Sequence, residues 1–565
     1  MKISNYIQID GLLILTNYKL NFVASNNSYS EKYIDREKYL FITLGHINKI
    51  ERNMEKKGPA YSNIEIQTKD GRMYYFFFSP QNSENSYQLY IKTYRQAFPE
   101  DIKKCFAFIY GQFDNQLELD YQGHKIYDSY QEFSRQGIDV APININIQDS
   151  NIQNQNYMFR YIDNSFGQIC PTYPPLIAIP FKVSNEYAIK CSRYRSRERL
   201  PALTYAYKKR NSQEFTTLWR CAQCKPGINQ NRSAEDEHML KMIRNNSLNN
   251  LKIYDARPFL NAVGQQLTGK GYEIIDFYQN CELEFLNIHN IHKIRDSLKK
   301  MFIAVNSNTQ DYLKDVDKSE WFTHINTIIS GSKKVAQAIY DSHHVVVHCS
   351  DGWDRTAQLL SLSQIFLDPY FRTIQGFEVL IEKEWISFGH QFNIRSGHVS
   401  KNHSDEQRAP IFIQFLDCVY QITKQFPLSF EFNSIFLRDI AFHVFSCQYG
   451  TFLHNSYQEI QVHKTRQNTV SLWSYINNRI TEYQNPYYIQ EQIYNINYLE
   501  PDSSIRSFSL WKEYFLQYQN GITDQYKIYQ QCQFNEYYFI FTYKTFYLFI
   551  ILLEITLWCF SNILK

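Results

Sequence analysis

The sequence has little excess charge of either sign. Its 59 Lys and Arg against 56 Asp and Glu leave a net charge of +3 at pH 7, and charged residues make up only 20% of the chain. Attraction to an anionic membrane would therefore have to come from local patches. We expect no nucleic-acid partner, because a balance this small offers no general attraction to phosphate backbones.

The sequence also lacks a framework of paired cysteines. Its eleven cysteines are scattered, and no positively charged, apolar-cored signal peptide opens the chain. The one Cys-x2-Cys pair, Cys221 and Cys224, has no second pair at zinc-finger spacing. We therefore expect a reducing, cytoplasmic setting, no metal site and no cofactor.

Aromatic residues, in contrast, are abundant at 16%, and 565 residues predict two or three domains. Near the N-terminus, two apolar runs flank Asp10-Gly11, a pair typical of a hairpin turn. Further short strands are predicted at 39–43, 47–51, 63–67 and 72–78, before a helix over 82–97. Strands closed by one helix predict a small β-barrel that serves as a scaffold, an interaction module or a lipid-headgroup site.

One stretch carries a specific chemistry. Three valines at 345–347 predict a buried strand, a turn containing glycine follows, and residues 356–367 repeat apolar side chains at helical spacing. Cys349 leaves the strand and Arg355 lies where the helix begins. Backbone N–H groups of the loop and the helix N-terminus then converge on one point, which predicts a phosphate cradle.

The same surroundings activate the cysteine. A thiol beside a helix N-terminus and a cation ionises near neutral pH, so Cys349 is predicted to be a nucleophile. The planar guanidinium of Arg355 can hold two phosphate oxygens and stabilise the transition state. Attack gives a phosphocysteine that water later hydrolyses. The alternative for Cys349 is a buried structural cysteine.

A second Cys-x5-Arg spacing occurs at Cys191 and Arg197. Its loop has no glycine, and no helix can start cleanly where it runs into Leu200-Pro201. We interpret this second occurrence as a coincidence.

The remainder alternates strands with helices. A helix is predicted over 125–137, an amide-rich surface segment over 143–156, and strands near 197–205, 216–223, 251–256 and 282–286. Helices are expected over 293–302 and 321–343, which predicts an α/β domain. His289 and His292 follow a strand, and we favour core or capping roles over catalysis for both.

Several stretches together resemble the myotubularin family of phosphoinositide 3-phosphatases. They are the loop at 349–356 and, in family order, residues 195–201, 255–258, 288–292, 382–390 and 414–418. The resemblance runs from about residue 6 to about residue 515. It implies an α/β cysteine-phosphatase domain, with a central sheet flanked by helices, over 120–515, and a PH-GRAM-like β-barrel over 1–115.

The resemblance implies removal of the 3-phosphate from phosphatidylinositol 3-phosphate and phosphatidylinositol 3,5-bisphosphate by a cytoplasmic, membrane-associated enzyme on endosomal membranes. Cys349 and Arg355 match the family nucleophile and phosphate-binding arginine, so an active enzyme is predicted. A protein tyrosine or dual-specificity phosphatase is the alternative enzyme, and an inactive lipid-binding adaptor is the alternative without catalysis. The resemblance is also compatible with a homodimer, or a heterodimer with related family members.

Departure of the inositol oxygen needs a proton donor, which this family is thought to take from a carboxyl inside the signature loop. Asp354 is the predicted acid because it lies beside Arg355. Asp351 is the second candidate, and it could instead position water or the headgroup. Either aspartate could also simply cap the helix.

Only some of the residues that contact substrate in the family are present in this sequence. Arg395 matches one headgroup-binding arginine, Gln391 replaces the other, and Gln265 replaces an asparagine. The lost positive charge at position 391 predicts that the bisphosphate is disfavoured relative to the family norm. The predicted substrate-binding residues are Ser350, Asp351, Gly352, Trp353, Asn290, Ile291, Arg395, Gln391 and Gln265.

Family members commonly end in a coiled coil, whereas this sequence ends in a hydrophobic tail over 536–565. About 20 apolar residues can cross a bilayer. Glu554, inside the run, costs roughly 2 to 3 kcal/mol there. The tail is interpreted as a membrane anchor, a buried C-terminal helix or an interfacial segment.

Overall fold

The computed structural model describes residues 2–4, 7–8, 10–24, 39–54, 62–113, 122–143, 157–209, 214–245, 247–306, 310–402, 405–490 and 498–516. The apolar tail at 536–565 and most of the amide-rich segment at 143–156 lie outside these ranges. Within the described ranges, no helix combines the length and the apolar character needed to cross a bilayer.

A five-stranded sheet lies at the centre of the larger, C-terminal part, in the order β12-β13-β16-β14-β15. β12 is antiparallel to β13, and the other neighbours are parallel. The middle strand β16 therefore delivers Cys349 to the carboxyl edge of the sheet, where α/β proteins bind ligands. The predicted strands are confirmed as β13 Phe215–Ala222, β14 Leu251–Asp255, β15 Cys281–Phe285 and β16 Val345–Cys349. β12 Ala202–Lys208 begins later than the strand predicted near 197–205, because Ser196–Glu198 forms a 3-10 helix.

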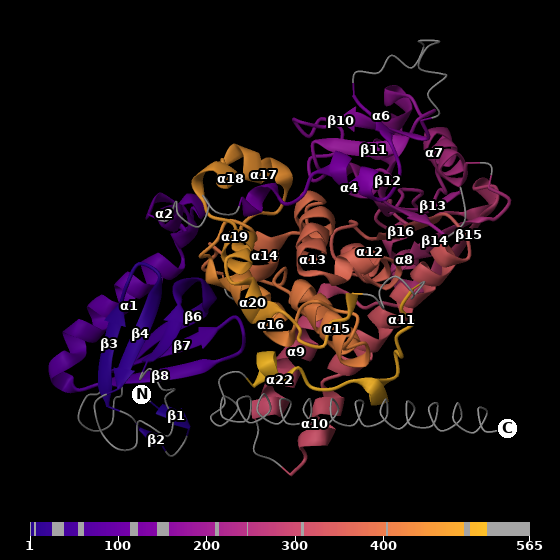
Figure 1. Cartoon of the computed structure of the whole chain (residues 1–565). Coiled ribbons are helices and arrows are strands. Elements are labelled where there is room, and N and C mark those ends of the chain that lie inside the picture. The colour runs from indigo at the N-terminus through magenta and orange to yellow at the C-terminus, as the bar shows by residue number, and fades with distance from the viewer. Residues whose placement is uncertain are drawn as a thin grey trace, which may run out of the picture.

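Helices cover both faces of this sheet (Figure 1). Val345 and Val347 join the core that contains α11 (Trp321–Tyr340) and α12 (Arg355–Leu367). Val346 joins the opposite core, with α6 (Asn185–Tyr194) and α7 (Ala234–Arg244). Side chains that alternate between the faces of a strand account for this division, and the α/β prediction is confirmed.

Further helices follow in this part of the chain, and most of them add residues to the first core. They are α8 Phe259–Gln266, α9 Ile291–Asn306, α10 Tyr312–Lys318, α13 Ile374–Ile381, α14 Phe392–Ser396, α15 Ile411–Gln425, α16 Ser434–Ser446, α17 Tyr457–Val462, α18 Thr465–Asn468, α19 Leu472–Asn477, α20 Ile480–Tyr483 and α22 Lys512–Phe515. A separate sheet has the order β11-β10-β9. Its strands are β9 Val140–Ala141, β10 Phe159–Asp163 and β11 Leu176–Pro180.

The N-terminal part forms two antiparallel sheets, β2-β1-β8-β7-β6 and β3-β4-β5. Both sheets share one core with α1, which includes Phe22, Ile66 and Phe98. The described strands do not close into a single barrel, so the predicted barrel is not confirmed. The elements are β1 Lys2–Ser4, β2 Ile7–Gln8, β3 Gly11–Leu15, β4 Lys19–Ala24, β5 Tyr39–Thr43, β6 Ile47–Met54, β7 Ser62–Thr68, β8 Met73–Phe78, α1 Ser83–Ala97 and α2 Phe106–Phe113.

The first hairpin turn was predicted at Asp10-Gly11, and the structure corrects this. Leu15 pairs with Leu20, so the turn lies at residues 16–18. The Thr16 hydroxyl oxygen accepts hydrogen bonds from the backbone N–H groups of Tyr18 and Lys19, at 3.2 and 2.9 Å. A side chain that satisfies the turn backbone replaces the glycine turn that the sequence suggested.

The helix predicted over 125–137 is also shorter than expected. The α-helix α4 (Ser129–Arg135) begins at Ser129 because the Asp128 side chain caps it, accepting from the N–H of Gln131 at 2.9 Å. Gly137, with φ +81°, follows its end as predicted.

Candidate active site

The predicted phosphate cradle lies at the carboxyl end of β16. The N–H of Gly352 points at Sγ of Cys349, 3.3 Å away, and α12 begins at Arg355. Gly352 has φ +76°, and a Cβ there would lie 2.4 Å from the carbonyl oxygen of Cys221. Only glycine fits both the backbone conformation and the close approach.

Gly352→Ala is therefore expected to lower phosphate release by about 100-fold, because the loop must shift to accommodate the methyl group. Gly264→Ala in α8 is the matched control, since nothing lies within 4 Å of a Cβ at that position. Initial rates and thermal midpoints of both variants check this. Full activity in Gly352→Ala would contradict the proposed loop geometry.

The surroundings of Cys349 favour the thiolate. The side chain is 2% exposed, and burial alone would raise its pKa. The Arg355 guanidinium and the hydrogen-bond donors of Thr356 outweigh burial and the repulsion from Asp354, so the Cys349 pKa lies below its usual range. The site thus has the chemistry of an activated sulfur nucleophile.

Arg355 is fixed beside this sulfur by two hydrogen bonds. Its Nη1 donates to the carbonyl oxygen of Ile288 and its Nη2 donates to Oγ of Ser350, each at 3.1 Å. The guanidinium plane is therefore oriented before any ligand arrives, which lowers the entropy lost on binding an oxyanion.

The sequence matches the family model of the myotubularin-like phosphatase domain over residues 105–461. Myotubularin of Xenopus laevis is 38% identical over 528 residues, covering 92% of this chain and 82% of the relative. A protein named phosphatidylinositol-3,5-bisphosphate 3-phosphatase MTMR2, from Gallus gallus, is 38% identical over 518 residues, covering 90% of this chain and 85% of the relative. The chain belongs to the myotubularin family.

In this myotubularin-family chain, Asp354 is held by Arg395 and His390. Arg395 donates from Nη2 and Nε to its two oxygens at 2.8 and 3.2 Å. Nδ1 of His390 lies 3.2 Å from Oδ1 and 2.9 Å from the carbonyl oxygen of Trp353. Burial would raise the Asp354 pKa, but Arg395 and His390 hold it well below its usual range. The site without substrate therefore contains a carboxylate at Asp354.

The second candidate acid, Asp351, lies in a different environment. Its Oδ1 accepts from Oγ of Ser196 at 3.1 Å and lies 3.7 Å from Nε of Arg197, and its side chain is 24% exposed. Asp354 makes no side-chain cap bond to α12, so the capping alternative is wrong for Asp354. The two aspartates of the loop thus have separate partners.

The predicted Asn-Ile pair starts α9. Oδ1 of Asn290 accepts from the N–H of Lys293 at 3.2 Å, and Ile291 is the first helical residue. Because Ile288 just before them accepts from Arg355, the start of α9 lies next to Arg355. The structure thus brings the pair close to the Cys349 loop, and its contact with substrate stays a prediction.

Gln391 is engaged with the protein backbone. Its Nε2 donates to the carbonyl oxygens of Gly389 and Asn455, each at 3.0 Å. Gln265 is partly buried near the end of α8, where its carbonyl oxygen accepts from the N–H of Lys270 at 3.1 Å. The side-chain amide of Gln391 is thus occupied in the substrate-free site, and it carries no charge.

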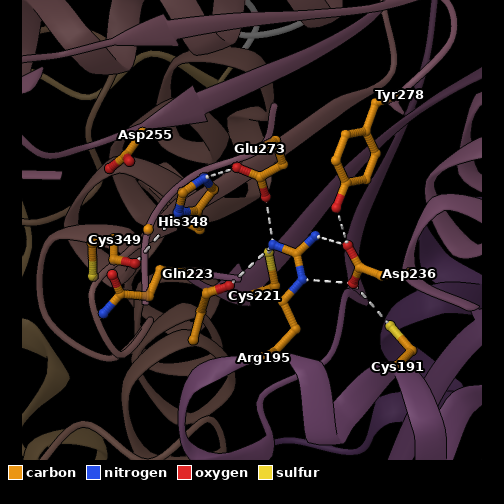
Figure 2. A network of polar contacts seen from close by, with 12 residues as sticks. Cys191, Arg195, Cys221, Gln223, Asp236, Asp255, Glu273, Tyr278, His348 and Cys349 are labelled. Atoms are coloured by element: carbon orange, nitrogen blue, oxygen red, sulfur yellow. Dashed lines mark hydrogen bonds and ion pairs between the residues drawn. The ribbon is translucent and has the colours of Figure 1, made fainter. Parts of the chain in front are cut away.

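A buried network beneath the loop was not predicted (Figure 2). Nε2 of His348 lies 3.0 Å from Glu273, and Glu273 also pairs with Arg195. Arg195 binds both oxygens of Asp236, at 2.7 and 2.6 Å. Burial lowers the His348 pKa, but Glu273 and Asp255 outweigh it, so His348 ionises more readily than usual. His348, the residue before Cys349, thus belongs to a buried network of alternating acidic and basic side chains beneath the loop.

Two further arginines hold the loop backbone directly and a third supports it through Gln223, and these roles were also missed. Arg199 and Arg220 donate to the carbonyl oxygen of Gly352 at 3.0 and 2.9 Å. Arg257 binds Asp255 and the side chain of Gln223. The backbone N–H of Gln223 in turn donates to the carbonyl oxygen of Cys349 at 3.0 Å. Residues 195–201 and 255–258 had been noted as family stretches, but the sequence did not indicate these contacts.

The second Cys-x5-Arg spacing is confirmed as a coincidence. Cys191 lies inside α6, where its thiol donates to Asp236 at 3.2 Å, and burial raises its pKa well above the usual range. Over the described residues, no group of three or more His, Cys, Asp or Glu side chains could hold a metal ion.

Proposed function

We propose that this chain is a phosphoinositide 3-phosphatase that removes the D3 phosphate from phosphatidylinositol 3-phosphate and from phosphatidylinositol 3,5-bisphosphate. The observation that carries the proposal is the low-pKa Cys349 in a loop bounded by Arg355, in a chain 38% identical to a named bisphosphate 3-phosphatase. Residues 120–515 are the proposed phosphatase domain. The named relatives favour a lipid over a phosphoprotein as the substrate.

The reaction proceeds in two steps. The Cys349 thiolate attacks phosphorus, a sulfur–phosphorus bond forms and the bond to the inositol oxygen breaks. Asp354 gives its proton to the departing oxygen, while Arg355 and the loop amides hold the phosphoryl oxygens. Water then attacks the phosphocysteine and gives its proton to Asp354, which releases phosphate and the thiolate.

Substrate binding has to change the environment of Asp354 for this role. In the free site Arg395 holds Asp354 as a carboxylate, with contacts at 2.8 and 3.2 Å. A headgroup phosphate competes for the same guanidinium, because Arg395 matches a headgroup-binding residue of the family. Loss of that cation raises the Asp354 pKa toward the range of a general acid.

One assay tests the proposed substrate class. Phosphate release is measured by malachite green from short-chain phosphatidylinositol 3-phosphate and from a phosphotyrosine peptide, with Cys349→Ser as the inactive control. We expect release from the lipid to exceed release from the peptide by at least about 100-fold in kcat/KM, the scale set by buried polar recognition. Preference for the peptide would indicate a protein phosphatase, and release from neither would indicate an adaptor.

Gln391→Arg is expected to raise the bisphosphate-to-monophosphate ratio of kcat/KM by about tenfold, the effect of one charge-assisted contact. Gln391 is uncharged and donates to two backbone carbonyls, so it offers no cation to a second phosphate. Gln391→Met, similar in length and also uncharged, is the control. An unchanged ratio in Gln391→Arg would contradict this assignment.

The N-terminal part, residues 1–115, is proposed to be a PH-GRAM-like domain. Two antiparallel sheets that share a core with one closing helix support this. We further propose that the enzyme works at endosomal membranes, since its proposed substrate is a membrane lipid, and that residues 536–565 form a tail that contributes to membrane attachment. Sedimentation with phosphatidylinositol 3-phosphate vesicles, with and without residues 536–565, measures that contribution.

A further inference from the structure

The N-terminal sheets rest on the end of α16. The ring of His46 lies 4.5 Å from that of Phe442, and the Tyr18 hydroxyl donates to Oε1 of Gln448 at 2.9 Å. A Cβ at Gly45 would lie 2.4 Å from the carbonyl oxygen of Phe445, so the two backbones are in close contact. All cysteines of the described residues are free thiols, so no disulfide joins these parts there.

A thiol–imidazole pair lies at this junction. Nε2 of His398 lies 2.9 Å from the carbonyl oxygen of Phe452, which can only accept, so Nε2 carries a proton. Nδ1 of His398 lies 3.3 Å from Sγ of Cys447. Nδ1 of the ring therefore faces the thiol, where it can accept the thiol proton, the arrangement that activates a nucleophilic cysteine.

A second thiol completes the cluster. Cys105, the residue before α2, lies in the same apolar cluster as Cys447, and the N–H of Ala107 donates to the carbonyl oxygen of Cys447 at 2.9 Å. The Cys105 thiol hydrogen bonds to Cys447. That bond lowers the Cys447 pKa, and His398 and Lys69 add to the effect against burial. The same bond and burial raise the Cys105 pKa. Cys447 is thus the more acidic of the two thiols.

Small molecules can reach this pair through a cavity of about 210 Å³. Cys105, His398 and Cys447 all line it, together with residues of the N-terminal part such as Tyr18 and Leu44. The cavity volume far exceeds that of one water molecule, so a small oxidant fits.

The backbone at Cys447 is also unusual. It has φ +52° at the C-cap of α16, a conformation that glycine adopts without strain and other residues rarely occupy. Strained positions of this kind are enriched at functional sites. A side chain is present here although glycine would relieve the strain.

We propose that Cys447 is a peroxide-sensitive thiol with Cys105 as its resolving partner, and that their disulfide covalently joins the N-terminal part to the phosphatase domain. The proposal is independent of the Cys349 reaction. The oxidant of the reaction is a hydroperoxide. The product is a disulfide that makes the noncovalent interface between the two parts covalent.

The chemistry balances as two steps. The Cys447 sulfur attacks a peroxide oxygen, so a sulfur–oxygen bond forms, the oxygen–oxygen bond breaks, and the leaving hydroxide takes the proton that His398 received. The Cys105 sulfur then attacks the sulfenic sulfur, and the hydroxyl group leaves as water with the Cys105 proton. Two thiols lose two electrons in total, and hydrogen peroxide is reduced to two waters.

The experiment uses the full chain carrying Cys349→Ser, which removes the competing catalytic thiol. After graded hydrogen peroxide and thiol blocking, digestion without reductant followed by mass spectrometry quantifies each disulfide. We expect the Cys105–Cys447 pair to be the main product and to disappear with dithiothreitol. Cys281 is the internal control, because it is 7% exposed against 5% for Cys105 and Cys447. Oxidation of Cys281 while Cys105 and Cys447 stay reduced would overturn the proposal.

Three variants separate the roles. Cys105→Ser should let Cys447 proceed to sulfinic acid, because the resolving thiol is gone. Cys447→Gly, which relieves the backbone strain and so should fold, should leave Cys105 reduced. His398→Gln should slow oxidation of Cys447 by about tenfold, since the base is lost. Unchanged oxidation in His398→Gln, or oxidation of Cys105 in Cys447→Gly, contradicts the assignment.

Discussion

Replacing Cys349 by serine is expected to lower phosphate release from phosphatidylinositol 3-phosphate by at least about 10⁴-fold, because the attacking sulfur is lost and a serine hydroxyl remains protonated. The surroundings of Cys349 favour an anion. The backbone nitrogen of Gly352 lies 3.3 Å from Sγ and donates to it, and Arg355 lowers the thiol pKa against the effect of burial. KM should change far less than kcat, since the loop amides and Arg355 still bind phosphate. Steady-state kinetics of the purified variant measure both constants.

Cys281→Ser is the matched control for this prediction. Cys281 lies on β15 of the same sheet, and its thiol donates to the carbonyl oxygen of Gln279 at 3.7 Å. It should retain activity. Alkylation provides a second measurement: inactivation of the unmodified chain should follow labelling of Cys349, with a half-maximal rate at a pH below about 8.5, the ordinary thiol value. Residual lipid hydrolysis in a fully labelled protein would contradict the phosphocysteine route.

Asp354→Asn is expected to lower kcat on the lipid by about 10² to 10⁴-fold, the range typical of general acid–base catalysis. The loss should be much smaller on p-nitrophenyl phosphate, whose leaving group departs without a proton. The basic limb of the kcat–pH profile should disappear as well, because kcat falls as pH rises through the pKa of an acid in the substrate complex. Rates of both esters across pH measure these effects.

Asp351→Asn is the comparison that assigns the acid. Asp351 contacts Ser196 and lies near Arg197, away from the Arg395 and His390 pair that holds Asp354. We expect Asp351→Asn to affect both esters alike. If the leaving-group dependence appears in Asp351→Asn and is missing in Asp354→Asn, the acid is Asp351.

The elements that could be predicted from sequence are those built from neighbouring residues. Strand, loop and helix at 345–367 are contiguous, so β-branched residues, one glycine and helical periodicity were enough to place Cys349 and Arg355 correctly. Most strands of the central sheet could be predicted for the same reason, since each is a short run of neighbouring apolar residues. The first hairpin turn was misplaced because the Thr16 hydroxyl, whose bonds are not visible in a residue pattern, forms the turn.

The prediction that the N-terminal strands close into one barrel failed for a different reason. Periodicity predicts strands but does not state which strands pair across a gap in the chain, and the structure places them in two sheets around one core. Helix α1 over 83–97 was predicted well because its signal is local.

The sequence by itself indicated the phosphate cradle at the end of β16, because the strand, the turn with its glycine and the start of the helix are contiguous in the chain. Only the tertiary structure decided the charges around it. Arg195 meets Asp236 and Glu273 from 41 and 78 residues away, and Asp354 meets Arg395 from 41 residues away. A sequence does not show whether a charged residue will be solvated or buried. Pairs of buried charges shift the pKa values of the groups around them much more strongly than solvated pairs do.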